Sequence, residues 1–345
     1  MGYKLLYITL LTGLLFAACS RENGMEPLLD DRPIVLSFSV DDFNSGVNFK
    51  GNEVGGNSLR STDDGSTSEQ DVNNLYLFLF DNTGANPVKY YIDAATFSGG
   101  TWVNSTSEKK ITLNLTQAEA GERQVHIIAN CADLKTQLDG VTTVTGLQTV
   151  FRNTTQPWTT DINTPILMSG SATHNFITQG YQLNSVHLIR AIAKIELNVT
   201  LTSGFQVVPT ITSENLTEYR FRFLDFDTHT YVEKPMPSKP NNLVSSSADA
   251  WPATGSWTPW GASLNGSPSP DTGTGYILDA GGKVTGLKLI TYLNERDEAG
   301  AVVEIELPRV DSGPLPPPEF GPELYRLPLP EKIERNMWYR YDIEI

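Results

Sequence analysis

Apolar and polar residues alternate along many short segments of this chain, and a period of two predicts β-strands rather than helices. Ile34, Leu36, Phe38 and Val40 would line one face of the first such strand. Further strands are predicted at residues 72–81, 88–93, 111–115, 123–129, 191–201, 218–226, 287–293, 301–307 and 337–345, and brief helices at 133–139 and 145–151. Because many short strands separated by Gly, Asn and Pro are typical of β-sandwiches, we predict an all-β fold with short helices.

The length of the chain predicts two domains. It has 345 residues, against about 150 for an average domain. We place the boundary before residue 184, so that residues 20–183 form an N-terminal sandwich and residues 184–345 a C-terminal one. Residues 44–71 form a polar tract that we predict to be mobile, and residues 235–275 form a long loop rich in Pro, Ser and Trp. A loop of that length is either functional or disordered.

The first residues predict export as a lipoprotein. Lys4 precedes an apolar run at residues 5–16, and Ala17 and Ala18 lie directly before Cys19. This order is that of a signal peptide at residues 1–19, with Cys19 as the residue that carries the lipid. The alternative is ordinary signal cleavage that leaves an unused cysteine. We predict a chain anchored by lipid in the outer membrane and later found at the cell surface.

Charge and motifs argue against several classes of function. The formal charge is -15 and no Lys/Arg cluster is present, so nucleic acid is not an expected partner. The sequence contains no HExxH, GxSxG, P-loop or CxxC motif, so we predict neither an enzyme nor a cofactor. Asp225, Asp227 and His229 would share one strand face, yet solvated strand residues explain them better than metal ligands. Cys131, the other cysteine, is predicted to be a small buried apolar residue.

Several segments together resemble the fimbrillin family of Bacteroidetes, the FimA/Mfa-like subunits of type V pili. They are the lipobox Cys19, NNLYLFLFD at 73–81, HIIAN ending at Asn130, PILMSG from Pro165, RAIAKIEL from Arg190, YLNE from Tyr292 and RNMWYRYDIEI from Arg335. The resemblance implies two transthyretin-like β-sandwich domains. It also implies a subunit that is processed by an arginine-specific protease and exchanges β-strands with other pilus subunits, identical or related. Adhesion is the function it implies.

Strand exchange requires a removable strand, and residues 33–43 are the candidate. Burial of the apolar face formed by Ile34, Leu36, Phe38 and Val40 would stabilise the fold by about 6–12 kcal/mol, which is an upper estimate. A sandwich that loses one edge strand exposes a hydrophobic groove and unpaired backbone groups that a strand of another chain can fill. We therefore predict that this plug strand shields the site of assembly.

Among the arginines before the second predicted strand, Arg60 is the best candidate for cleavage, between Arg60 and Ser61. Arg21 lies beside the lipid, and Arg32 precedes Pro33, whose ring disfavours cleavage. Arg60 lies in a tract of small polar residues that favours nicking. The alternative is that Arg60 is an ordinary loop charge and the chain remains uncut.

Two further features are candidates for binding. The apolar residues Tyr339, Tyr341, Ile343 and Ile345 alternate along the last strand, which is either a donor for another subunit or an ordinary closing strand. Trp251, Trp257 and Trp260 lie in the long loop and would either bind a glycan or host protein or pin the loop to its own domain. The alternative function is thus a surface lipoprotein that does not polymerise, or a tip adhesin.

Overall fold

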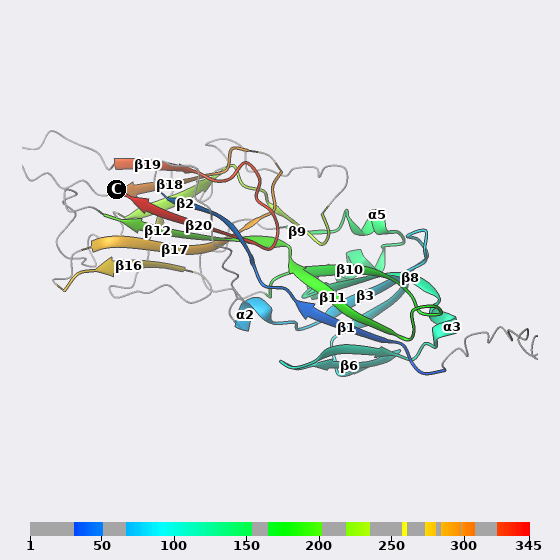
Figure 1. The fold of residues 1–345 in the computed structure, drawn as a ribbon. Coiled ribbons are helices and arrows are strands. Elements are labelled where there is room, and N and C mark those ends of the chain that lie inside the picture. Colours follow the sequence, from blue (N-terminus) through cyan, green and yellow to red (C-terminus); the bar gives the residue numbers. More distant parts are fainter. Residues whose placement is uncertain are drawn as a thin grey trace, which may run out of the picture.

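The computed structural model describes residues 31–50, 67–153, 165–201, 219–234, 257–260, 273–280, 284–297, 299–307 and 323–345. Strands dominate these residues and the helices are short, so the all-β prediction is confirmed (Figure 1). Two bodies lie side by side, each built from packed β-layers.

The first body contains nine of the described strands in one continuous sheet. Their order is β4 (Val88–Ile92), β3 (Leu75–Phe80), β8 (Glu122–Ala129), β10 (Met168–Asn175), β11 (Gln182–Arg190), β1 (Val35–Val40), β7 (Lys109–Leu113), β6 (Gly100–Asn104) and β5 (Thr96–Phe97). β10 and β11 pair at Met168–Arg190 and Ser169–Ile189, where one strand begins and the other ends. One core cluster joins residues on both sides of this corner, among them Leu77 of β3 and Leu36 of β1. The sheet therefore folds over on itself to form two layers.

β3 is buried on both faces, which explains its uninterrupted apolar sequence LYLFLF. Leu77 points into the core between the layers, whereas Phe78 points to the outer face. There the short helices η1 (Ala132–Leu134), α4 (Lys135–Asp139) and α5 (Val144–Leu147) cover it with Leu138 and Leu147. The helices predicted at 133–139 and 145–151 thus lie close to helices of the structure. A further helix, α3 (Gln117–Ala120), begins with a capping box between Thr116 and Glu119.

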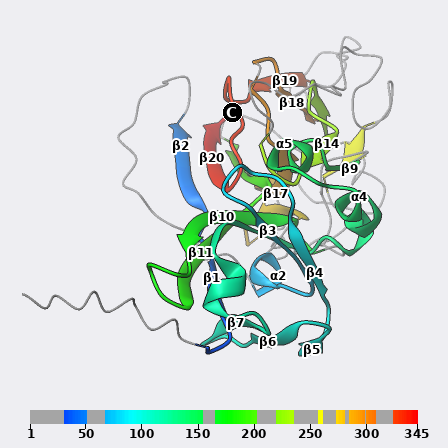
Figure 2. The same cartoon turned by 90° about the vertical axis from the view of Figure 1, so that its right-hand side faces the viewer.

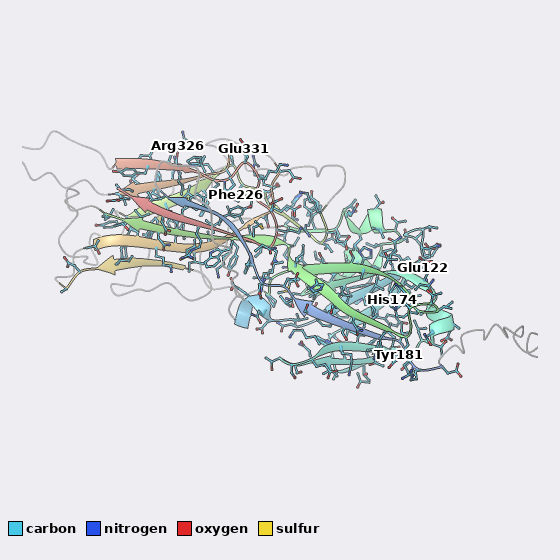
Figure 3. All side chains as sticks on the ribbon, in the orientation of Figure 1. Glu122, His174, Tyr181, Phe226, Arg326 and Glu331 are labelled. Atoms are coloured by element: carbon cyan, nitrogen blue, oxygen red, sulfur yellow. The ribbon has the colours of Figure 1, made fainter. Side chains whose placement is uncertain are left out.

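The second body is a sandwich of two sheets. Among the described residues, the strands of one sheet have the order β16 (Gly273–Leu278), β17 (Val284–Asn294), β12 (Ile192–Thr200), β20 (Met337–Glu344) and β2 (Asn44–Lys50). The strands of the other sheet have the order β15 (Thr258–Pro259), β13 (Arg220–Leu224), β18 (Val302–Leu307) and β19 (Glu323–Pro328). Side chains from both sheets, such as Leu197, Phe221 and Ile305, share one core. Figure 3 shows side chains filling the space between the layers, with Phe226 labelled in this body.

The chain passes between the two bodies more than once. β11 continues through Ala191 into β12, so the predicted boundary before residue 184 falls within a strand of the first sheet. β1 and β2 are consecutive, yet β1 belongs to the first sheet and β2 to the second (Figures 1 and 2). A small ribbon of β9 (Phe151–Asn153) and β14 (His229–Tyr231) forms a third connection. Division of the chain at a single point remains a prediction. β2 precedes the predicted boundary in the sequence, yet it belongs to a sheet of the second body.

Two expectations need correction. The tract 44–71 is predicted to be mobile, but its first residues form β2 and residues near its end form α2 (Thr67–Gln70); residues 51–66 lie outside the described residues. Main-chain pairing with β20 holds β2, and such pairing does not require apolar alternation. Asp225, Asp227 and His229 do not share a strand face, because β13 ends at Leu224 and β14 begins at His229. The described residues contain no cluster of acidic, His or Cys side chains that could hold a metal.

Candidate functional site

β1 lies inside the first sheet rather than at its edge. It runs parallel to β11 on one side and antiparallel to β7 on the other. The amide of Ile34 donates to the carbonyl of Leu115 at 2.9 Å, and the amide of Asp41 donates to that of Leu188 at 2.9 Å. Removal of β1 would therefore leave two strands with unpaired backbone groups.

The predicted plug residues of β1 face the core. Ile34 and Leu36 are fully buried and Phe38 is nearly so, while Val40 is partly buried at the end of the strand. Phe43, just beyond β1, is also fully buried. Each of the four buried side chains contributes about 1.5–3 kcal/mol, so the total is on the order of 6–12 kcal/mol as an upper bound.

The N-terminal segment, residues 31–50, is also held at its beginning and at its end. Arg32 stacks on the ring of Tyr181, with the guanidinium carbon 4.0 Å from the ring centre; Figure 3 shows Tyr181 at the far end of the first body. At the other end β2 lies parallel to β20 and forms the edge of the second sheet (Figure 2). One stretch of chain thus completes both sheets.

Between β1 and β2, at residues 41–43, the chain crosses from the first body to the second. These residues, called the crossing segment below, lie over a group of buried polar side chains that we call the junction: Arg190, Lys194 and Asn336. The Arg190 guanidinium donates to the carbonyl of Asp41 at 2.7 Å and to Oδ1 of Asn336 at 3.0 Å. The side-chain amide of Asn336 in turn donates to the carbonyl of Asp42 at 2.7 Å. Arg190 and Asn336 are both almost completely buried. These contacts give the crossing segment a defined position, because a buried donor left without its acceptor costs about 1–3 kcal/mol.

Two cations face the ring of Phe43 in this junction. The guanidinium carbon of Arg190 lies 4.1 Å from the ring centre, and Nζ of Lys194 lies 5.5 Å from it. The ring of Tyr292 lies nearly parallel to that of Phe43, with 6.4 Å between the ring centres. Such cation–π contacts stabilise by about 2 kcal/mol when the groups are shielded from water.

α2, which follows the N-terminal segment in the sequence, also contacts the residues of the junction. Nζ of Lys194 lies 3.1 Å from a carboxylate oxygen of Glu69 in α2, and the Tyr292 hydroxyl donates to that carboxylate. The main-chain carbonyl of Glu69 also accepts from Arg190 at 2.8 Å. Glu69 is fully buried. α2 therefore has contacts of its own to Arg190 and Lys194, separate from those of the crossing segment.

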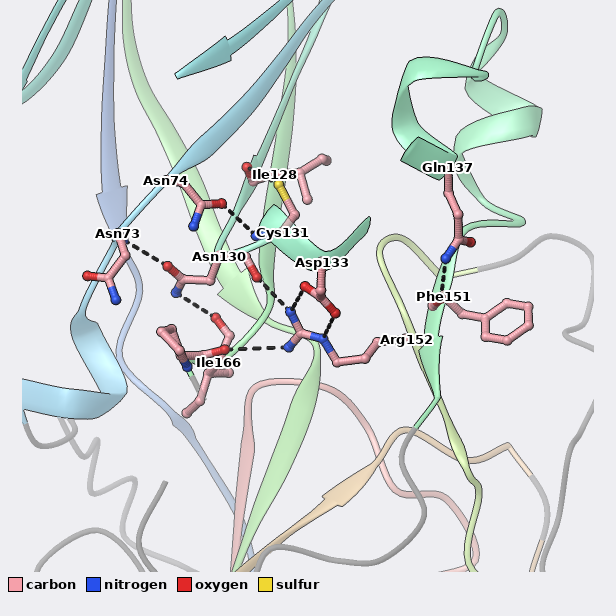
Figure 4. A network of polar contacts seen from close by, with 11 residues as sticks. Asn73, Asn74, Ile128, Asn130, Cys131, Asp133, Gln137, Phe151, Arg152 and Ile166 are labelled. Carbon is pink, nitrogen blue, oxygen red and sulfur yellow. Dashed lines mark hydrogen bonds and ion pairs between the residues drawn. The ribbon is translucent and has the colours of Figure 1, made fainter. Parts of the chain in front are cut away.

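A second network fixes the residues between α2 and β3 (Figure 4). The side-chain amide of Asn130 donates to the carbonyls of Asp71 and Ile166, both at 2.7 Å, and its oxygen accepts from the amide of Asn73 at 2.8 Å. The carbonyl of Asn130 accepts from Arg152 at 2.7 Å. Asn130 has a φ of 60°, a left-handed conformation that Asn tolerates well. This network holds the start of β3 independently of β1 and β2.

The last strand, β20, lies inside its sheet because β2 covers its outer edge. Tyr339 and Tyr341 are buried in the second core, and Ile343 and Ile345 pack against that core. Burial raises the pKa of both tyrosine hydroxyls above the ordinary value. Arg335, just before the strand, forms an ion pair with the buried Glu295. The strand is thus firmly attached within its own sandwich.

The tryptophans of the long loop do not form one surface. Trp260 is fully buried, packs on Phe221 and donates to the carbonyl of Lys288 at 3.0 Å. The expectation that Trp260 binds a ligand is therefore wrong, because its indole completes the core. Trp257 is partly exposed and lies against the guanidinium of Arg222, 4.3 Å from the ring centre. Trp251 lies outside the described residues.

Three other predicted site residues, Cys19, Arg60 and Ser61, also lie outside the residues that the structure describes. Within the described ranges, no helix is long and apolar enough to cross a membrane. Cys131 is buried as expected, and burial raises the pKa of its thiol to about 12.

The sequence reasoning did not single out Arg190, Lys194 or Asn336. A signal for Arg190 and Lys194 was present, since RAIAKIEL places both cations beside a run of apolar residues. Cations in such a position are buried only when they are paired.

Comparison with known proteins identifies the class. Residues 47–216 match the profile of the major fimbrial subunit protein (FimA), and residues 191–344 that of the C-terminal part of the minor fimbrium tip subunit MfA4. The chain is 54% identical over 346 residues to the minor fimbrium tip subunit MfA4 of Porphyromonas gingivalis, with 100% of both chains covered. The chain therefore belongs to the fimbrillin family, the fimbrial subunits of Bacteroidetes.

Solved structures give weaker similarities. The tip fimbrial protein Mfa3 of Porphyromonas gingivalis has a TM-score of 0.43 and 13% identity, with 90% of this chain and 94% of that chain covered. A fimbrial assembly protein of Parabacteroides distasonis has a TM-score of 0.38 and 14% identity, with 90% of each chain covered.

The resemblance to fimbrillins that the sequence motifs indicated is confirmed. As a family member, the protein is a pilus subunit of the cell-surface fimbrium that assembles with other subunits and functions in adhesion.

Proposed function

We propose that this chain is a tip subunit of a fimbrium, a structural protein rather than an enzyme, which is exported as a lipoprotein through Cys19 and cut after Arg60. The cut separates the segment that carries β1 and β2 from the rest of the chain. A strand of a neighbouring subunit then replaces this segment. Lipid on Cys19 anchors the uncut chain in the outer membrane, and loss of the segment frees the subunit for assembly.

The observation that carries this proposal is the path of residues 31–50. They contribute an inner strand to the first sheet and the edge strand to the second, and both lie before Arg60 in the sequence. The residues that follow Arg60 have separate contacts, through Glu69 to Lys194 and through Asp71 to Asn130. A cut between these two groups of contacts would release the first strands without loosening β3.

The position of the C-terminal strand supports a place at the end of a polymer. β20 lies between β12 and β2, with Tyr339 and Tyr341 in the core. Withdrawal of β20 as a donor would unpair β12 and leave the second core open. We propose that the chain accepts a strand from the next subunit and donates none, in line with the tip role of its relative from Porphyromonas gingivalis.

The proposal is tested with Arg60→Ala and Arg60→Lys, neither of which an arginine-specific protease can cut at that position. The wild-type chain should give a new N-terminus at Ser61, lose residues 20–60, and then bind a partner subunit in a pull-down assay. Both variants should stay uncut and fail to bind. Equal binding by cut and uncut chains would refute the role of the cleavage.

A surface ligand is a separate part of the proposal, and Trp257 is the residue that favours it because its ring is partly exposed. Trp257→Ala should weaken attachment of fimbriated cells to a glycan or protein surface, with assembly unchanged. Attachment equal to that of the wild type would exclude Trp257 as a ligand contact.

A further inference from the structure

We infer that the junction between the two bodies selects the incoming strand by an aromatic side chain at the position of Phe43. This inference rests on the strand replacement proposed above and adds a requirement to it. The partner is an extended segment of another fimbrial subunit. Its apolar residues must match the positions of Ile34, Leu36 and Phe38, and an aromatic ring must lie where Phe43 lies.

The main chain of the segment carries little of this selection. β1 pairs with β7 and β11 through backbone groups, and any extended strand can replace these. The contacts of Arg190 to Asp41 and of Asn336 to Asp42 also use main-chain carbonyls, which every residue supplies. Selection must therefore come from side chains.

The site of Phe43 differs from the other apolar sites because it is lined by charge. The guanidinium of Arg190 and the ammonium group of Lys194 both face the ring, and both side chains are almost completely buried. The face of an aromatic ring carries partial negative charge that attracts a cation, whereas an aliphatic side chain offers no such attraction. An aliphatic residue would fill the same space next to two cations and lose that stabilisation.

Phe38 provides the internal comparison. It is an aromatic residue of the same segment, and it is buried to nearly the same extent as Phe43. Its neighbours in the core are apolar, such as Val186, its partner on β11. The shape of the ring matters at both positions, whereas its electrostatic character matters at Phe43.

The test uses the full chain cut after Arg60, from which the N-terminal segment can dissociate. Fluorescent peptides of residues 31–50 compete with one another for the place that this segment leaves. One peptide has the natural sequence, and two others carry cyclohexylalanine in place of Phe43 or of Phe38. Cyclohexylalanine keeps the size of the ring and removes its π electrons. We expect about 5- to 30-fold weaker binding for the change at Phe43 and less than about 3-fold for the change at Phe38.

Equal effects at the two positions, or no effect at Phe43, would overturn the aromatic requirement while the natural peptide still binds. Failure of the natural peptide to bind the cut chain would overturn strand replacement itself, and the aromatic requirement with it. A second variant, Lys194→Met in the receiving chain, keeps the length of the side chain and removes one cation. The penalty for cyclohexylalanine at Phe43 should shrink in this variant, and an unchanged penalty would exclude Lys194 from the selection.

Discussion

Leu36→Ala is the substitution that most directly measures how strongly β1 is held. Leu36 is fully buried between its partners Leu183 on β11 and Ile111 on β7. Replacement of a buried Leu by Ala costs about 2–5 kcal/mol, because apolar contact is lost and a cavity remains. In the cut chain, where only noncovalent contacts hold the segment, its affinity should fall by between about 30-fold and a few thousand-fold.

The assay is the rate at which the fluorescent N-terminal segment leaves the cut chain in the presence of excess unlabelled peptide. Ser37→Ala is the matched control, since Ser37 is the next residue of β1 and points to the other face of the sheet. Its effect should stay within about 0.5 kcal/mol. If Leu36→Ala and Ser37→Ala release the segment at the same rate, burial of the apolar face does not hold β1 and the reasoning is wrong.

Three further predictions concern the rest of the chain. Asn130→Ala should lower the free energy of unfolding by about 1 kcal/mol more than Asn130→Gly, because only Ala is strained by the left-handed backbone at this position. Urea unfolding measures the two variants, and an equal loss of stability would contradict the role of the backbone. Trp260→Phe should lower the free energy of unfolding by about 1–3 kcal/mol, because the carbonyls of Gly275 and Lys288 lose the indole donor. Surface attachment should stay unchanged, and reduced attachment by a folded variant would contradict the buried position of Trp260. The Cys131 pKa is raised from 9.0 to about 12, so its contribution to stability is complete below pH 9 and is lost as the pH rises from 9 to 12. A thiol reagent at pH 8 should label Cys131 only after denaturation, and rapid labelling of the native chain would contradict its burial.

Several elements could be predicted because the information is local. β1 and β20 have one apolar face each, and the alternation shows which residues lie inside. β3 has an uninterrupted apolar run that indicates a strand buried on both faces. The helices that cover its outer face, at 132–139 and 144–147, lie close to the predicted ranges 133–139 and 145–151.

Other elements depend on contacts between distant residues. β2 has the sequence NSGVNFK, in which only Val47 and Phe49 are apolar; this is too short an alternation to predict a strand, and β2 forms because β20 offers a parallel edge. The two cations of RAIAKIEL could be recognised as unusual, but their partners Phe43 and Glu69 lie far away in the sequence. For Trp260 the sequence leaves a ligand contact and packing against its own domain both open, because it does not show that the ring completes the second core.

The central claim is that one N-terminal segment completes both sheets and can be removed from both by one cut. Hydrogen–deuterium exchange of the cut chain, measured before and after the segment is displaced, tests it most directly. We predict that amides of β7 and β11 in the first sheet and of β20 in the second lose protection together, while β3 and β8 stay protected. Loss of protection in only one sheet, or in neither, would contradict the account.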